Sequence, residues 1–217
     1  MEEEEAIKRG FDIEELKREQ LKLAKLVSLK DAFDFNLASK FAAIHTETFT
    51  PKELIASIAI LDADLNILEE RYVIKQVKFP YISGLRAYRE LPIMLAVYEK
   101  IENEPDVIFV EGHGIAHPRH LGLASHLGIS LNKPTIGIAK KPLVGELKDS
   151  ELLLQSKVIA KAIITKEGAK PILVSPGHLI SLKTAVELTK KCIKQPHKLP
   201  EPIVVARKLI DKVKELL

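Results

Sequence analysis

The stretch FVEGHGIAHPRHLG, residues 109–122, places ionisable side chains beside glycines at the end of an apolar run. Glu111 ends the apolar segment, and three histidines and an arginine follow it before Gly122. A loop that only connects two elements needs glycines but not this density of ionisable groups. A carboxylate that ends a strand is a hard oxygen ligand, which divalent ions use in phosphodiester hydrolysis. The stretch therefore predicts a functional site.

Two further glutamates are candidates for the same site. Glu90 lies on an expected helix, and Glu47 shares a strand face with His45 because residues two apart point the same way. Carboxylates from separate elements suit one or two divalent cations. The alternative for each glutamate is a solvated surface charge, and it stays open here.

Four histidines close together in sequence offer a rival chemistry, a zinc site: His113, His117, His120 and His126. A glycine and a proline interrupt any helical register among them, and no thiolate lies nearby, which disfavours zinc. Arg119 and Lys140 are better interpreted as phosphate contacts, with plain surface charge as the alternative.

Two turns carry possible nucleic-acid contacts. FPYISG, residues 79–84, is a rigid turn that would hold Tyr81 out as a wedge able to part or replace a base, or as an ordinary aromatic side chain. SPGH, residues 175–178, is expected to be a tight turn into a helix whose free backbone N–H groups face a phosphate or cap the helix.

The apolar patterning that must position these residues predicts an α/β chain with a mixed sheet. We expect helices at 12–28, 85–102 with Pro92 as a kink or a new start, 118–128, 180–194 and 203–216, and strands at 40–49, 106–110, 134–139, 157–165 and 170–175, with a hairpin over 53–79 that turns at DADLN. In such sheets chemistry gathers where central strands end, here after 40–49, after 106–111 and after 139.

Composition sets outer limits on the kind of protein. The 217 residues have no linker-like segment, which predicts one domain over 1–217, and 46% hydrophobic with 29% charged residues exclude a disordered or membrane-spanning chain. The acidic start MEEEEAIKRG is unlike a signal peptide, and the single Cys192 fits a reducing compartment, so we expect a cytoplasmic protein. The net charge of +3 is compatible with polyanion binding without demonstrating it.

Five segments, in this order and spacing, resemble the endonuclease V family of the ribonuclease H-like superfamily. They are FPYISGLRAYRELP (79–92), DVIFVEGHGIAHPRHLGLASHLG (106–128), PTIGIAKKPL (134–143), TKEGAKPILVSPGH (165–178) and LPEP (199–202). With a weaker match at 14–20 they span nearly the whole chain. The resemblance implies a mixed central sheet of antiparallel hairpin strands plus parallel strands, flanked by helices. It also implies Mg²⁺-dependent hydrolysis of the second phosphodiester bond 3′ to a (deoxy)inosine in DNA or RNA, with a 3′-hydroxyl and a 5′-phosphate as products.

Some of the family's functional positions match this chain. The wedge corresponds to Pro80, Tyr81, Ile82 and Ser83, the helix glutamate to Glu90 and the active-site lysine to Lys140. The matching loop and turn place Gly112, Gly114, His117, Arg119, Gly177 and His178 among the expected nucleic-acid contacts.

Three of the four metal-site positions depart from the family pattern. His45 stands where the family has an aspartate, Glu111 replaces a second aspartate, and Arg207 replaces a histidine or aspartate at a catalytic position. Imidazole suits Mg²⁺ poorly, and a carboxylate moved by about 1 Å can cost on the order of 100-fold in rate. Glu47 is the expected substitute carboxylate, and Mn²⁺ would suit His45 better than Mg²⁺.

Three hypotheses follow for a monomeric protein that meets deaminated DNA or RNA. The first is an active inosine-directed endonuclease whose metal site uses Glu47 or His45 with Glu90 and Glu111. The second is a family member that binds inosine strands through Tyr81 and the loop at 111–122 without cleaving them. The third is another metal-dependent hydrolysis at the histidine loop.

Overall fold

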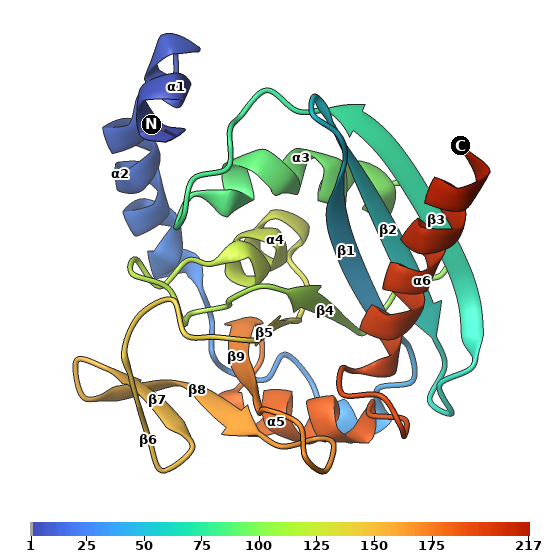
Figure 1. Ribbon diagram of the computed structural model, residues 1–217. Coiled ribbons are helices and arrows are strands. Elements are labelled where there is room, and N and C mark those ends of the chain that lie inside the picture. Colours follow the sequence, from blue (N-terminus) through green and yellow to red (C-terminus); the bar gives the residue numbers. More distant parts are fainter. Residues whose placement is uncertain (1) are drawn as a thin grey trace.

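The computed structural model describes residues 2–217, and one mixed sheet dominates them (Figure 1). Its strands are β1 Phe41–Thr50, β2 Glu53–Leu61, β3 Ile67–Gln76, β4 Val107–Glu111, β5 Thr135–Ala139, β6 Glu146–Lys148, β7 Glu151–Leu154, β8 Lys157–Ile163 and β9 Ile172–His178. Within the described residues the order is β3-β2-β1-β4-β5-β9-β8-β7-β6. Strands β1, β4 and β5 run parallel, and the other neighbouring pairs run antiparallel.

Helices cover both faces of this sheet. They are α1 Glu2–Lys8, α2 Ile13–Leu23, α3 Arg86–Tyr98, α4 Leu123–Leu131, α5 Leu182–Lys191 and α6 Glu201–Leu216, with single 3₁₀ turns at Ala24–Leu26 and Phe35–Leu37. Helices α3 and α4 pack with one buried layer, and α5 and α6 with another on the opposite face, where α6 crosses β1 and β2 (Figure 1). Strand β4 is apolar along nearly its whole length because both of its faces are covered.

These observations confirm the expected α/β mixed sheet flanked by helices. The hairpin turn also lies where DADLN predicts it, with the carboxylate of Asp62 accepting the backbone N–H groups of Asp64 and Asn66, each at 2.9 Å. Helix α3 continues through Pro92, so no new helix begins there. The helix expected at 118–128 begins only at Leu123 and ends at Leu131, before the left-handed residue Asn132.

The prediction for SPGH is wrong. Residues 175–178 belong to β9, where they are buried and pair with β5, and α5 begins only at Leu182 after its N-cap Ser181. The register between β5 and β9 shifts between Pro176 and His178, which leaves Gly177 as the extra residue of a β-bulge. Proline and glycine are therefore tolerated here because a bulge interrupts the ladder.

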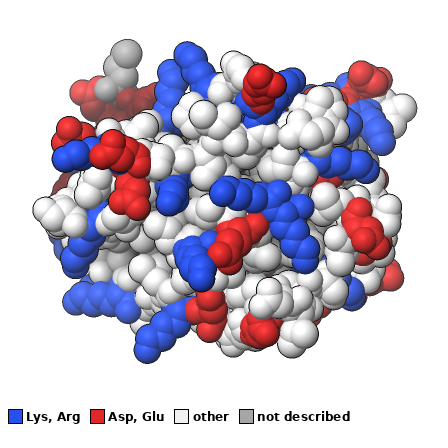
Figure 2. Space-filling model, turned by 90° about the horizontal axis from the view of Figure 1, so that it is seen from below, with Lys and Arg blue, Asp and Glu red and all other residues white. Residues whose placement is uncertain are grey.

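Helix α1 and the hairpin β6–β7 had no counterpart among the sequence-based expectations. Both are short, and β6 is exposed throughout, so neither carries a strong apolar period. On the face seen in Figure 2, Lys and Arg side chains are interspersed with Asp and Glu, in keeping with the small net charge. No helix within residues 2–217 combines the length and the apolar character that crossing a membrane requires.

Candidate functional site

The sheet brings the predicted ionisable residues to one edge. Glu111 is the last residue of β4, Lys140 follows the end of β5, and both strands run parallel to β1. Because carboxyl ends of parallel strands meet at the same edge, these residues lie beside His45 and Glu47 of β1. Helices supply the rest, Glu90 from α3 and Arg207 from α6.

Glu111 is the centre of the cluster. Arg207 binds its carboxylate with two donors, Nε to Oε2 at 2.8 Å and Nη2 to Oε1. Lys140 Nζ lies 3.4 Å from Oε1, and His45 Nδ1 lies 3.2 Å from Oε2, although not aligned as a hydrogen bond. Burial alone would raise the pKa of Glu111, but His45 and Arg207 outweigh burial and hold that pKa far below its ordinary value. The carboxylate is therefore ionised at neutral pH.

Glu47 is also paired with protein cations. His45 Nε2 lies 3.0 Å from Glu47 Oε1, and the ammonium group of Lys214 contacts Oε2. Burial opposes ionisation of Glu47, but the contacts with Lys214 and His45 lower its pKa overall. The imidazole of His45 thus lies between two glutamates.

Glu90 is buried and is held by its own helix. Arg86, four residues earlier on α3, pairs with both of its oxygens, including Nη2 to Oε2 at 2.9 Å, and the Thr46 hydroxyl donates to Oε2. The Nη1 of Arg86 also donates to the backbone carbonyl of Glu111 at 2.9 Å. Arg86 therefore links the helix carboxylate to the end of β4.

This arrangement does not fit a divalent cation. A Mg²⁺ or Mn²⁺ ion needs several oxygen ligands that are free to turn toward it, whereas Glu47, Glu90 and Glu111 each face a lysine or arginine. Among residues 2–217, no three His, Cys, Asp or Glu side chains gather closely enough to hold a metal ion. The predicted metal site at His45, Glu47 and Glu111 is thus an ion-pair network in this structure.

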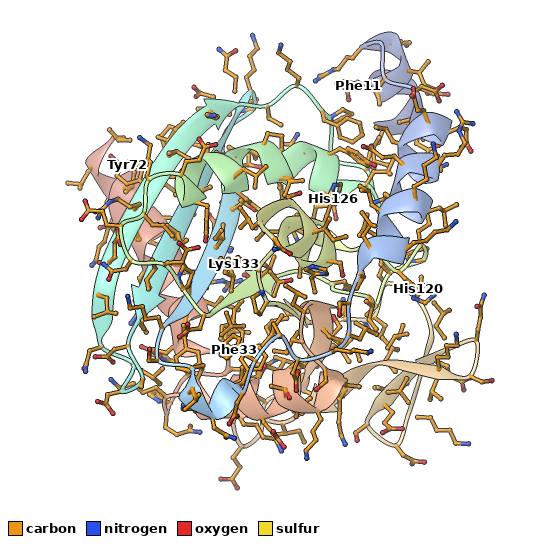
Figure 3. All side chains as sticks on the ribbon, turned by 180° about the vertical axis from the view of Figure 1, so that it is seen from behind. Phe11, Phe33, Tyr72, His120, His126 and Lys133 are labelled. Atoms are coloured by element: carbon orange, nitrogen blue, oxygen red, sulfur yellow. The ribbon has the colours of Figure 1, made fainter. Side chains whose placement is uncertain are left out.

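The four histidines of the zinc alternative do not form such a group among residues 2–217 either. His126 lies on α4, edge-on to the ring of Tyr88, whereas His120 lies apart from it on the loop before α4 (Figure 3). The four histidines therefore do not converge on one point.

A pocket of about 260 Å³ opens beside the cluster. Its lining includes Tyr81, Ser83, Gly112, His113, Leu123 and Lys140, and Glu111 also borders it. Tyr81 is 53% exposed, as expected for a wedge, while Pro80 and Ile82 are buried beneath it. The pocket thus lies between an exposed aromatic ring and the charged ends of β4 and β5.

Three hydrogen bonds to the backbone carbonyl of Gly84 hold the wedge segment, residues 79–84, in place. The φ of Gly84 is +77°. That carbonyl accepts Arg119 Nη2 at 2.8 Å, His117 Nε2 at 3.0 Å and the amide of Gln20 at 3.1 Å. Arg119 Nε also donates to the Gln20 side chain at 2.6 Å. In this structure the guanidinium of Arg119 therefore braces the wedge, and His117 has the same role. A phosphate contact of Arg119 stays a prediction.

Two glycines and a histidine predicted to bind nucleic acid lie inside the protein. A Cβ on Gly114 would lie 2.0 Å from the carbonyl oxygen of Pro176, and one on Gly177 would lie 2.3 Å from Thr135 Oγ1. His178 is buried and accepts the Ser28 backbone N–H through Nδ1 at 3.2 Å. Gly114 therefore packs the loop at 111–122 against β9, whereas Gly177 lies against β5 and His178 contacts the Ser28 backbone. The assignment of these three residues as nucleic-acid contacts stays a prediction.

The buried histidines predict a loss of stability in mild acid. Burial lowers the pKa of both His113 and His117 to about 4, with Arg86 and Arg119 respectively adding to the effect. The unfolded chain binds these protons near pH 6.5 and the folded chain does not, so stability is complete above that pH and falls as pH drops toward 4. For His117 the expected loss is about 2–3 kcal/mol.

Urea unfolding at about pH 7 and about pH 5 measures this loss, and in His117→Gln the loss should be smaller. An unchanged pH dependence in that variant would contradict the assignment of His117 as a buried neutral imidazole.

Some residues of the site were not found from the sequence. Arg86 and Glu90 stand four apart on a helix, a spacing that signals an ion pair, so this contact was open to prediction. Gln20 and Lys214 carried no local signal, because their partners lie far away in the sequence.

The strand order, the parallel strand ends and the adjoining pocket define a ribonuclease H-like α/β protein with a site at the strand ends. The family model for endonuclease V matches residues 21–208. The chain belongs to the endonuclease V family, which places it among the endonucleases.

Curated relatives and solved structures agree with this assignment. Endonuclease V of Thermosipho melanesiensis is 41% identical over 169 residues, 74% of each chain, and that of Xylella fastidiosa is 36% identical over 220 residues, covering 94% of this chain and 90% of the relative. The Bacillus subtilis structure has a TM-score of 0.85 at 27% identity and covers 95% of this chain and 93% of its own. The Ciona intestinalis structure, in complex with DNA containing an inosine, has a TM-score of 0.84 at 26% identity and covers 94% of this chain and 99% of its own.

Proposed function

We propose that this protein is an inosine-directed endonuclease that hydrolyses the second phosphodiester bond 3′ to a (deoxy)inosine in DNA or RNA. The observation that carries the proposal is the pocket beside the exposed Tyr81, which opens next to Glu111 and Lys140. Membership of the endonuclease V family and the inosine-containing DNA bound to the Ciona intestinalis relative support it. We further propose that one cytoplasmic copy of this single-domain chain acts alone in the repair or processing of deaminated strands.

Recognition would begin when Tyr81 stacks in the place of a base and the displaced base enters the pocket. His113 lines this pocket as a neutral imidazole, because burial lowers its pKa to about 4. Its buried Nδ1 has no hydrogen-bond partner within residues 2–217. In a neutral imidazole one ring nitrogen donates a hydrogen bond and the other accepts one, so His113 is suited to the polar edge of a purine.

The expected cofactor, Mg²⁺ or Mn²⁺, does not fit glutamates that are each paired with a lysine or arginine. Lys140 is well exposed beside Glu111 and would meet a strand phosphate. The pairing of Glu111 with Arg207 favours a second candidate function, binding of inosine strands without hydrolysis.

The two candidates are separated by a strand labelled at its 5′ end that carries one deoxyinosine, incubated with excess protein and Mg²⁺, Mn²⁺ or EDTA. The endonuclease is expected to cut the second phosphodiester bond 3′ to the inosine. A strand that stays intact but bound establishes the second candidate. Equal affinity for inosine and adenine strands would overturn both candidates. Repeating the experiment with an RNA strand of the same sequence shows whether DNA or RNA is preferred.

Removing the wedge is expected to weaken the preference for inosine. In Tyr81→Ala the affinity for the inosine strand should fall about tenfold, because an aromatic ring stacked on a base contributes about 1–3 kcal/mol. Tyr72→Ala is the matched control, since Tyr72 is 44% exposed on β3, away from α2 and the wedge (Figure 3). Fluorescence anisotropy measures both variants, and equal losses in the two would contradict the role of Tyr81.

A further inference from the structure

The three glutamates at the strand ends are already paired with cations of the protein itself. Each of the three glutamates faces a lysine or arginine: Arg207 and Lys140 at Glu111, Lys214 at Glu47, and Arg86 at Glu90. A divalent ion would have to displace the two donors of Arg207 to reach the oxygens of Glu111. Bidentate guanidinium–carboxylate pairs are among the stronger ion pairs in proteins, so this displacement is unfavourable.

Arg207 is held in place by the packing of α6. The residue before it, Ala206, is fully buried, and its carbonyl accepts the hydroxyl of Ser57 on β2 at 2.7 Å. The Nε and Nη2 groups of the Arg207 guanidinium donate to the carboxylate of Glu111, while its Nη1 makes no hydrogen bond to the rest of residues 2–217. Its side chain is 32% exposed, and that of Lys140 on the other side of Glu111 is 59% exposed. Two cations with free donors thus flank one carboxylate.

We propose that Arg207 is a built-in cation that, together with Lys140, holds a backbone phosphate of the bound strand, so that strand binding requires no divalent ion. The guanidinium keeps its charge at any ordinary pH, and its free Nη1 has the geometry for a phosphate oxygen. Lys140 adds a mobile ammonium group on the pocket side. The inference rests on the proposed function only in taking a nucleic-acid strand as the ligand.

Strand binding in EDTA tests the proposal directly. The dissociation constant of the wild-type protein for the inosine strand should stay the same, within about twofold, when Mg²⁺ is replaced by EDTA. Arg207→Gln should weaken binding about tenfold and make the salt dependence shallower by about one counterion. Lys208→Gln is the control. Lys208 is the exposed neighbour of Arg207 on α6, and its substitution removes the same charge. Release of the strand by EDTA would overturn the proposal.

A titration with Mn²⁺ alone, followed by electron paramagnetic resonance, gives an independent readout. Wild-type protein should leave Mn²⁺ free, whereas Arg207→Gln, which liberates Glu111, should bind it. Tight binding of Mn²⁺ by the wild type would sink the proposal even if the variant failed to fold.

An adenine strand separates this proposal from the proposed function. A phosphate contact is independent of the base, so Arg207→Gln should weaken the adenine and inosine strands equally. If the wild-type protein binds both strands with equal affinity, and Arg207→Gln weakens both equally, the proposed function is contradicted. The phosphate contact of Arg207 is then still supported.

Discussion

Replacing Gly114 by alanine is expected to destabilise the protein by about 3 kcal/mol or more, at or beyond the upper end of the cost of overpacking a core. The added Cβ would lie 2.0 Å from the Pro176 carbonyl oxygen and 2.6 Å from its carbon, and both are backbone atoms that cannot swing away. The loop would have to lift off β9, which breaks the bond from Gly114 N to Ser175 Oγ at 2.8 Å. It would also break the bond from Ile115 N to Pro176 O at 2.9 Å.

Urea unfolding of Gly114→Ala beside Gly112→Ala measures this effect. A Cβ on Gly112 meets mainly side-chain atoms, the nearest being Leu123 Cβ at 3.3 Å, so that variant should lose about 1 kcal/mol or less. Similar losses in the two variants would show that the loop does not lie against β9 as described. If only Gly114→Ala loses stability, we also expect this variant to lose strand binding, because its loop at 111–122 no longer folds.

The second large effect is expected for Arg86→Met, which leaves Glu90 as a buried and nearly unpaired carboxylate. Glu90 is 6% exposed, and without Arg86 only the hydroxyl of Thr46 still binds it. Removing one partner of a buried ion pair costs about 3–5 kcal/mol, and we expect the lower end because Arg86 is itself 32% exposed. The variant also loses the bond to the Glu111 carbonyl.

A double-mutant cycle isolates the contribution of the pair. Arg86→Met combined with Glu90→Gln removes both charges, so its stability should recover by about 1–3 kcal/mol relative to Arg86→Met alone. Thermal unfolding followed by circular dichroism measures each corner of the cycle. Additive losses in the double variant would mean that Arg86 and Glu90 do not stabilise each other.

The ion-pair network contains the three residues that are expected to depart from the family pattern, His45, Glu111 and Arg207. Glu111 and Arg207 form a bidentate pair, so a longer carboxylate and an arginine are mutually compatible at these positions. His45 fits the same network, because its two nitrogens lie near Glu47 and Glu111. These three residues therefore meet at Glu111, whose carboxylate contacts both His45 and Arg207.

The sequence by itself determined the family, the mixed sheet and the meeting of functional residues at the strand ends. The family follows from the resemblance of ordered motifs. The sheet and its strand ends follow from local patterns: apolar periods set the strands, and an ionisable residue such as Glu111 at the end of an apolar run marks a strand end. The exposed wedge residue Tyr81 could also be predicted, because the turn that holds it is a contiguous motif.

Only the tertiary structure decided which partner each polar group has. Arg207 reaches Glu111 across 96 positions of sequence, and Arg119 binds Gly84 instead of facing solvent. Gly114 and Gly177 are expected from the sequence to contact nucleic acid, and the folded chain adds that atoms of Pro176 and Thr135 lie too close to them for any side chain. Residue type sets what a group can bind, whereas long-range packing sets which atoms come within reach. The pairing of Glu111 with Arg207 and of Glu47 with Lys214 is therefore visible only in the folded chain.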